Sequence, residues 1–276
     1  MKFDFMSKSL SSLADIQTGP FGSQLHKEDY VDIGTPIVTV EHLGRKRFSE
    51  QNLPCVSAQD KERLSKYILQ EGDIVFSRVG SVDRCSYVSK EYAGWMFSGR
   101  CLRVRPNADI DSQFLYYYFT LETTKQFVRG IATGATMPSI NTKFMGEVPV
   151  VYPSIEIQRK IAGILSAIDN KIDVNNAINE NLEQQADALY QAFFSPKSGT
   201  QGKIVTLDEY CSIFTGKKNA NASVEGGKYK FFTCAPDALQ IDSYIYDGNA
   251  IIVSGNGAYT GRTRFYSGRF DLYQRT

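Results

Sequence analysis

The sequence predicts an α+β fold with three parts: a mixed α/β domain, a long coiled-coil-type helix, and a partial second copy of the first domain. Three observations lead to this prediction. The chain has 276 residues, 42% of them hydrophobic, which allows one large or two ordinary globular domains. Apolar residues at helical spacing run through its middle, and short segments on the two sides of that helix repeat in the same order.

The first region, residues 1–153, mixes strands, helices and polar loops. Alternating or apolar stretches at 36–40, 73–76 and 101–105 predict strands. The segment Ser57–Leu69 predicts a short helix that begins with a capping box of Ser57 and Asp60. The loops between these elements are rich in Gly, Ser, Arg and Lys.

A second helix is expected at Asp111–Arg129, closed by Gly130. It contains the aromatic run FLYYYF at 114–119. Large aromatic side chains at this density are more often core residues than base-stacking residues. We therefore expect the run to pack in the core of the domain.

Residues 154–195 predict one long helix. Apolar side chains recur at steps of three and four, which places them on one helical face. Pro153 and Ser154 mark its start, and Ser195-Pro196 marks its end. About 41 residues at ~1.5 Å each make a rod of ~60 Å. The apolar positions are Ile157, Ile161, Ile164, Ile168, Ile172, Ile178, Leu182, Leu189 and Phe193.

This spacing favours a coiled coil. With Ile161 at heptad position a, three further apolar residues fall at a, and Asn175 occupies that position in the middle. A polar residue at position a can fix the register and the choice of partner. The partner helix would come from another chain; the alternative is a helix packed on its own domain. The predicted pairing residues are Ile157, Ile161, Ile164, Ile168, Asn175, Ile178, Leu182 and Leu189.

A linker, residues 196–203, leads to the partial second copy at 204–276. Three blocks recur in order on both sides of the helix, which indicates a domain duplication with loops of different length. Thr276 corresponds roughly to Gly99, so about 100 residues of the repeat are missing from this copy. We expect 204–276 to be loosely packed with exposed sheet edges. The paired positions are Leu13 with Leu207, Gly19 with Gly216, Thr39 with Thr233, Gly72 with Gly248, Ser77 with Ser254, and Gly80 with Gly257.

Charge and hydropathy exclude several classes of protein. Lys plus Arg is 31 and Asp plus Glu is 30, so the chain does not bind nucleic acid through bulk charge, although a local basic groove stays possible. There is no apolar run of 18 residues, and the first residues lack the apolar core of a signal peptide. We expect a cytoplasmic chain with no membrane segment.

No motif indicates catalysis or metal binding. The five cysteines are scattered without a CxxC pair, and His26 and His42 stand apart from them. The sequence has no P-loop, no GxGxxG, no NPPY-like methyltransferase motif, and no nuclease carboxylate cluster with a following lysine. We expect reduced thiols, no metal site and no catalytic residue.

Two motifs resemble those of one known family, the specificity subunits of type I restriction–modification systems. The first motif is the block GDIVFSRVGS at 72–81. In addition, the segment TGATMPSINTKFMGEVPVVYP at 133–153 resembles the family's connection between its recognition domain and its helix. The resemblance covers nearly the whole chain, with the second target recognition domain truncated. The other motif is the helix opening PxxxxQxxIAxxLxxxDxxI, formed by Pro153, Gln158, Ile161, Ala162, Leu165, Asp169 and Ile172.

The resemblance implies a non-catalytic subunit that binds double-stranded DNA. Such a subunit carries two target recognition domains, each reading half of a bipartite site, and long helices that pair antiparallel and set the half-site spacing. It docks methyltransferase (M) subunits, which methylate adenine, and a restriction/translocase (R) subunit joins for ATP-dependent cleavage. S-adenosylmethionine, ATP and Mg thus belong to partner subunits, and the resemblance implies no cofactor for this chain.

The short second domain departs from the family pattern and leaves three interpretations open. The chain is a fragment or frameshifted product, a half-subunit that forms a homodimer through Ser154–Phe194, or a silent recombination cassette. Two other functions are kept as alternatives. One is an inactive coiled-coil scaffold without specific DNA recognition, and the other is a single-chain nuclease or methyltransferase.

Four loops are candidates for reading DNA: Gly19–Lys27, His42–Arg47, Ser77–Ser86 and Thr133–Asn141. Base edges are read by Arg, Lys, Gln, Asn and Ser side chains, whereas Lys, Arg and backbone N–H groups bind phosphates. For each residue alone, the alternative is a solvated charge or a turn residue. The predicted contacts are Gln24, Lys27, Arg45, Lys46, Arg47, Arg78 and Arg84.

Overall fold

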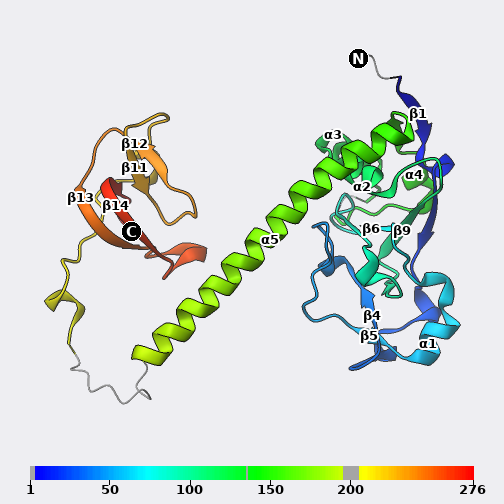
Figure 1. Ribbon diagram of the computed structural model, residues 1–276, viewed down its shortest axis with the longest axis horizontal. Coiled ribbons are helices and arrows are strands. Elements are labelled where there is room, and N and C mark those ends of the chain that lie inside the picture. Colours follow the sequence, from blue (N-terminus) through cyan, green and yellow to red (C-terminus); the bar gives the residue numbers. More distant parts are fainter. Residues whose placement is uncertain (1–3, 135, 195–204) are drawn as a thin grey trace. The chain divides into compact units, whose positions relative to one another are not determined.

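The computed structural model describes residues 4–134, 136–194 and 205–276. The side chains of Ser23 and Lys27 and the linker predicted at 196–203 lie outside the described part. The chain divides into two compact units, Met1–Leu189 and Tyr190–Thr276. Figure 1 shows the first as a mixed α/β domain with the long helix α5, and the second as a small sheet. The α+β fold class is confirmed.

The first unit is built on a four-stranded antiparallel sheet. The block GDIVFS supplies its inner strand β6, and helix α2 packs on one face of this sheet. Ile74 and Phe76 of β6 face that helix, whereas Val75 enters a second core on the other face. Burial on both faces explains why β6 is apolar without alternation. The strand order is β2 (Ala14–Thr18), β9 (Cys101–Pro106), β6 (Ile74–Ser77) and β7 (Cys85–Tyr87).

The second core of this unit lies under a smaller sheet and the helix α1 (Ala58–Arg63). The order of that sheet is β3 (Tyr30–Val31), β5 (Cys55–Val56), β4 (Thr35–Val38) and β8 (Met96–Phe97). Within the unit, β1 (Met6–Ser9) pairs antiparallel with β10 (Pro149–Tyr152). That pair and the short helix α4 (Thr142–Gly146) lead the chain into α5.

The helix expected at Asp111–Arg129 is two helices, α2 (Ser112–Thr120) and α3 (Glu122–Ile131). Leu121 between them has an extended backbone, with ψ 134°, so the helix stops and restarts. The helix expected at Ser57–Leu69 ends at Arg63 and is followed by a 3-10 turn at Ser65–Tyr67, and its cap at Ser57 is confirmed. The aromatic run lies in the core as predicted, since Phe114, Leu115, Tyr116 and Phe119 are buried.

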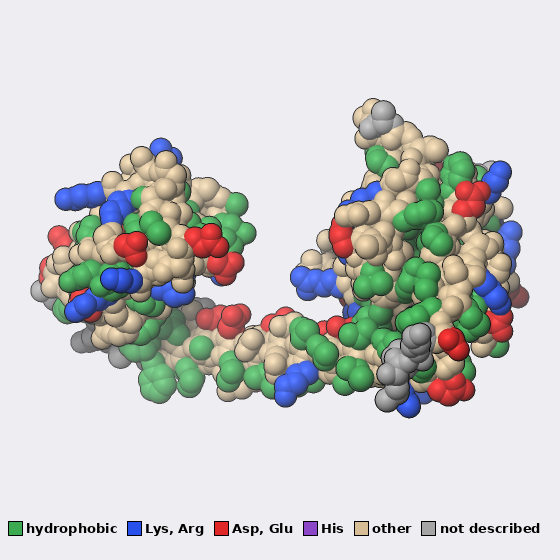
Figure 2. All heavy atoms as spheres, turned by 90° about the horizontal axis from the view of Figure 1, so that it is seen from above, with side chains coloured by type: hydrophobic (Ala, Val, Ile, Leu, Met, Phe, Trp, Pro, Cys, Tyr) green, Lys and Arg blue, Asp and Glu red, His purple; other side chains and the backbone are tan. Residues whose placement is uncertain are grey.

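The long helix α5 (Ile155–Phe194) uses two different faces. Gln158 and Ala162 are buried against the domain, and the Gln158 side chain accepts a hydrogen bond from the Asp111 backbone at 2.8 Å. The apolar stripe lies roughly 140° around the axis from this docked face. Its isoleucines and leucines beyond Ile157 are exposed, and hydrophobic side chains recur along the helix in Figure 2. The helix therefore packs on its own domain and still keeps a stripe available for a partner.

The second unit is a four-stranded sheet that repeats part of the first. In the first unit β4 pairs parallel with β8, and in the second β11 pairs parallel with the end of β14. Gly19 lies against the carbonyls of Phe97 and Ser98, while Gly216 lies against those of Leu272 and Tyr273. The two units thus share a parallel strand pair and a glycine packed against it, which agrees with the predicted duplication. The strand order is β12 (Leu239–Ile241), β11 (Tyr229–Phe232), β14 (Thr263–Leu272) and β13 (Tyr246–Val253).

The register of the repeat corrects the sequence alignment at its end. The Gly19 amide donates to the Cys101 carbonyl at 3.2 Å, and the Gly216 amide donates to the Thr276 carbonyl at 3.4 Å. Thr276 therefore matches Cys101, the first residue of β9, and not Gly99. The difference of two residues arises because loop lengths differ between the copies, so the offset between matching positions changes along the chain.

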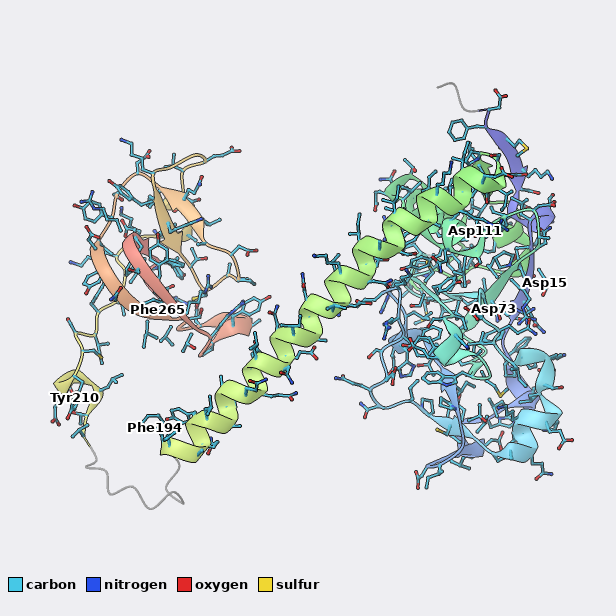
Figure 3. The ribbon with its side chains drawn as sticks, in the orientation of Figure 1. Asp15, Asp73, Asp111, Phe194, Tyr210 and Phe265 are labelled. Atoms are coloured by element: carbon cyan, nitrogen blue, oxygen red, sulfur yellow. The ribbon has the colours of Figure 1, made fainter. Side chains whose placement is uncertain are left out.

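The second unit exposes the strand face that α2 covers in the first. Ile251 pairs with Phe265 across β13 and β14, as Ile74 pairs with Tyr87 across β6 and β7. Ile74 is buried and Tyr87 packs on Tyr116 of α2, but Phe265, labelled in Figure 3, is 71% exposed. Strand β13 is also an edge strand in the described sheet, whereas β6 pairs with β9. The expected exposure of sheet edges is confirmed.

Candidate nucleic-acid interface

The loop between β6 and β7, Ser77–Ser86, is the centre of the candidate interface. The Ile140 amide donates to the Arg78 carbonyl at 3.0 Å, and the Gly80 amide donates to the Pro138 carbonyl at 2.8 Å. These bonds tie the loop Thr133–Asn141 to the β6–β7 loop along the backbone. Two loops that are far apart in sequence therefore form one surface.

The Arg78 side chain brings in the loop Gly19–Lys27. Its guanidinium lies 5.7 Å from the centre of the exposed Phe21 ring, a cation–π geometry. One guanidinium nitrogen lies 3.5 Å from the Gly99 carbonyl, and Nε is buried without a hydrogen-bond partner among the described residues. Arg78 is half-buried and so is partly structural, while it still reaches the surface between three loops.

The loop His42–Arg47 joins the same centre through Arg84. The Arg84 guanidinium donates to the Leu43 carbonyl, and the Gly44 amide donates to the Ser86 hydroxyl at 3.2 Å. Gly44 has φ 120°, a backbone conformation that favours glycine, and a Cβ there would lie 2.7 Å from Arg84 Nε and would displace that side chain. The Arg84 side chain thus links the β6–β7 loop to the loop His42–Arg47.

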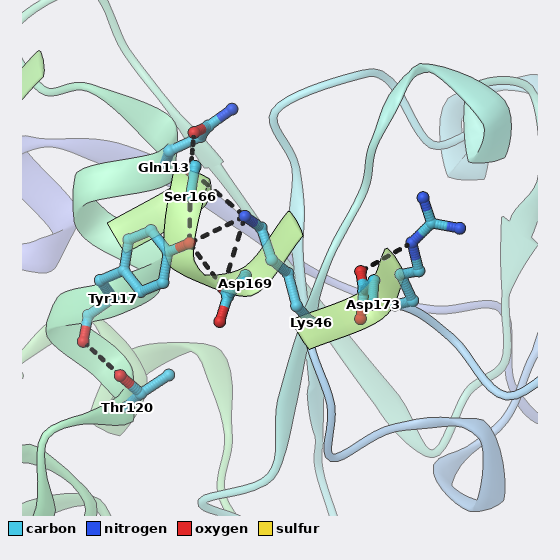
Figure 4. Close-up of polar contacts among 8 residues, drawn as sticks. Lys46, Gln113, Tyr117, Thr120, Ser166, Asp169 and Asp173 are labelled. Atoms are coloured by element: carbon cyan, nitrogen blue, oxygen red, sulfur yellow. Dashed lines mark hydrogen bonds and ion pairs between the residues drawn. The ribbon is translucent and has the colours of Figure 1, made fainter. Parts of the chain in front are cut away.

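Lys46 and Arg47 point at helix α5. Lys46 Nζ donates to the Tyr117 hydroxyl at 2.8 Å and lies 3.5 Å from the Asp169 carboxylate, as Figure 4 shows. Arg47 lies 3.4 Å from Asp173 and 3.6 Å from Glu91. The structure therefore places both of these predicted DNA contacts in ion pairs within the chain.

Gln24 also has an internal role, and Lys27 cannot be placed because its side chain is outside the described residues. The Tyr67 hydroxyl donates to Gln24 Oε1 at 2.6 Å, and Arg63 donates to the Gln24 backbone carbonyl at 2.9 Å. These bonds hold the loop Gly19–Lys27 on the second core.

Arg45 is the predicted residue that is left exposed with no ion pair or side-chain hydrogen bond in the part of the chain that the structure describes. The structure adds three residues that the sequence analysis missed. Arg100 is exposed beside Arg78, whose amide donates to its carbonyl at 2.8 Å, and Phe21 and Met137 are exposed at loop tips. No periodicity marks such residues, because their exposure depends on how the loops fold.

Other arginines of the domain are occupied in its interior. Arg105 makes two 2.7 Å hydrogen bonds to the buried Asp73 of the GDIVFS block, and this contact raises the pKa of Arg105. Arg103 pairs with Asp15 on the same sheet; Figure 3 labels both carboxylates. Arg103 and Arg105 are thus paired with carboxylates of the sheet and are not part of the loop surface.

The described residues contain no group of three or more His, Cys, Asp or Glu side chains arranged to hold a metal ion. Burial raises the pKa of the Cys85 and Cys101 thiols to about 12, so both stay protonated and unreactive near neutral pH. Among the described helices, none is long and apolar enough to cross a membrane.

Four loops joined on one hairpin form one surface of a domain, and the long helix that follows this domain has an exposed apolar stripe. The sequence profile of the type I restriction modification DNA specificity domain matches residues 3–184. The chain belongs to this family.

Comparisons with individual proteins agree with the family. The chain is 43% identical over 74 residues to the type I restriction enzyme EcoDI specificity subunit of Escherichia coli, covering 27% of this chain and 16% of that protein. It is 26% identical over 174 residues to the HindI specificity subunit of Haemophilus influenzae, a match that covers 62% of this chain and 38% of that protein. The matches thus span less than half the length of these relatives.

A solved structure confirms the fold. The crystal structure of a type I restriction–modification S subunit from M. genitalium matches 99% of this chain and 71% of its own, with a TM-score of 0.70 and 16% identity. The likeness therefore extends through the domain, the helix and the second unit taken one after another.

Proposed function

We propose that this chain is the sequence-specific DNA-binding specificity subunit of a type I restriction–modification complex. The observation that supports this most is the joining of four loops on the β6–β7 hairpin in a chain of this family. Arg45 is exposed beside this centre, and Arg78 and Arg100 lie within it. Guanidinium groups of this kind pair with guanine edges in the major groove or with phosphates.

In this proposal the chain supplies recognition and its partners supply chemistry. Methyltransferase subunits bring S-adenosylmethionine and methylate adenine, and a restriction/translocase subunit brings ATP hydrolysis, Mg and cleavage. The apolar stripe of α5 pairs with a second helix, from another copy of this chain, and so sets the distance between two half-sites. The chain itself needs no catalytic residue and no cofactor.

Arg45→Ala is expected to weaken binding to the preferred sequence by about 1–3 kcal/mol if Arg45 contacts a base. The measurement uses a random-sequence duplex library, selected with the chain and its methyltransferase subunit, followed by affinities for the selected and a scrambled duplex. An equal loss on both duplexes would make Arg45 a phosphate contact. Lys90→Ala, an exposed lysine of the same unit outside the four loops, is the matched control and should change neither affinity.

Two results would contradict the proposal as a whole. One is a library in which the complex enriches no sequence. The other is modification or cleavage of DNA by the purified chain without partner subunits, which would indicate a catalytic protein.

A further inference from the structure

Three loop and helix elements of the first unit meet in a polar cluster that we call the helix clamp. It consists of Lys46 and Arg47 from the loop His42–Arg47, Tyr117 from α2, and Ser166, Asp169 and Asp173 from α5 (Figure 4). Ser166 and Asp169 are three residues apart and Asp173 is four further on. This spacing places all three on the same side of the helix, the side that faces the domain.

Lys46 is enclosed by the clamp. Besides its bond to Tyr117, its Nζ donates to the Ser166 hydroxyl at 3.2 Å and lies 5.1 Å from the centre of the Tyr117 ring. Ser166 in turn donates to Gln113 Oε1 at 2.5 Å. The Lys46 side chain is 21% exposed, against 60% for Arg47. A partly buried amine with several partners is held far more firmly than a surface charge.

Tyr117 links the positive and negative sides of the clamp. Its hydroxyl accepts from Lys46 and donates to Asp169 Oδ2 at 2.6 Å. Burial and the hydrogen bond to the Asp169 carboxylate raise the pKa of Tyr117, so the phenol keeps its proton. Lys46, Tyr117 and Asp169 form one continuous chain of hydrogen bonds from loop to helix.

Strand β7 holds the backbone on both sides of Arg45. The Lys46 carbonyl accepts from the Tyr87 amide at 2.9 Å, and Gly44 is bonded to Ser86 on the other side. Arg45 thus stands exposed between two anchored residues. Both backbone anchors lie on β7, and the Lys46 side chain ties the second of them to α5 as well.

We propose that Lys46 and Arg47 are positioning residues, held by Asp169 and Asp173, which fix the DNA-reading loop with Arg45 on the spacer helix. Neither of them contacts DNA in this proposal, which rests on the proposed function. Because α5 also carries the pairing stripe on another face, the clamp sets where Arg45 stands relative to the helix that spaces the half-sites. Specificity then depends on the Asp169 carboxylate of α5. This group is negatively charged, as a phosphate is, so it cannot act by binding the DNA backbone.

A charge swap separates positioning from direct contact. Lys46→Glu and Asp169→Lys, each alone, should lower the preference for the selected duplex over the scrambled one about tenfold or more. The double variant should restore much of that preference, because the pair is rebuilt with reversed charges. If Lys46 contacts a phosphate instead, Lys46→Glu would weaken both duplexes alike, the double variant would not recover, and the salt dependence would fall by about one ion.

Asp187→Lys is the matched control, since it puts the same charge on an exposed position of the same helix outside the clamp. It should leave the preference unchanged. Loss of preference in this control equal to that in Asp169→Lys would overturn the proposal, as would intact preference in Asp169→Lys. Tyr117→Phe removes one hydroxyl only and serves where a charge variant does not fold; it should lower the preference several-fold.

Amide hydrogen exchange of residues 43–48 tests the clamp without DNA. Asp169→Asn should speed exchange at these amides about tenfold or more, while the amides of β9 stay protected. Unchanged exchange would overturn the clamp. If the wild-type complex enriches no sequence but Asp169→Asn frees the loop, the proposed function fails and the clamp stands as a structural link.

Discussion

Replacing Ile164 and Ile168 together with Asp is expected to abolish the proposed pairing of two copies of the chain through α5. Both side chains are exposed in the single chain and lie one turn apart on the apolar stripe of α5. Burying an isoleucine contributes about 1.5–3 kcal/mol, and each copy contributes two. A pair of helices would lose this burial and also meet four carboxylates, so the dissociation constant should rise by ~1,000-fold or more.

Light scattering of the chain, alone and with the methyltransferase subunit, measures this directly. The control is Ala177→Asp with Gln184→Asp, which adds the same charges at exposed positions of α5 away from the stripe. This control should remain associated. A wild-type chain that stays monomeric at all concentrations, both alone and with its partner, would rule out pairing between copies through the stripe.

Phe119→Ala is expected to destabilise the first unit by about 3–5 kcal/mol. Phe119 is 1% exposed, and its ring meets that of Phe76 edge-on, with the centres 4.8 Å apart. The substitution leaves a cavity between α2 and the central strand β6. Domains of this size are stable by about 5–15 kcal/mol, so this loss is a large share of the total. Denaturant unfolding followed by circular dichroism measures it.

Phe5→Ala is the control, because it removes the same side chain from an exposed position of the same unit. It should change the unfolding free energy by no more than about 0.5 kcal/mol. Phe119→Leu, which keeps most of the volume, should cost well under the alanine substitution. Equal losses for Phe119→Ala and Phe5→Ala would show that α2 does not pack on β6 as the structure has it.

The elements that the sequence predicted well depend on local patterns. Helix α5 follows from apolar steps of three and four, and the Ser57 cap from a serine three residues before an acid. The break at Leu121 was missed because its neighbours are all acceptable in a helix. Leu121 takes an extended conformation where α2 ends and α3 starts, and its own side chain, a good helix former, does not predict this break.

The candidate site shows the same division. Glycine-rich loops could be recognised in the sequence, and their joining on the β6–β7 hairpin agrees with a common surface. The roles of individual basic residues could not be read there. Arg45, Lys46 and Arg47 are adjacent and similar in charge, yet the first is exposed and the other two are paired with α5.

By itself the sequence determined the long helix with its apolar stripe, the duplication, and the family, because periodicity, motif order and spacing are properties of neighbouring residues. Only the tertiary structure decided that α5 has a second, polar face, and that it is used by Lys46, whose partner Ser166 is 120 residues away. A lysine has the same intrinsic chemistry wherever it stands. Whether it is free for DNA or held by a carboxylate depends on which distant segment the folded chain brings to within about 3–4 Å of it.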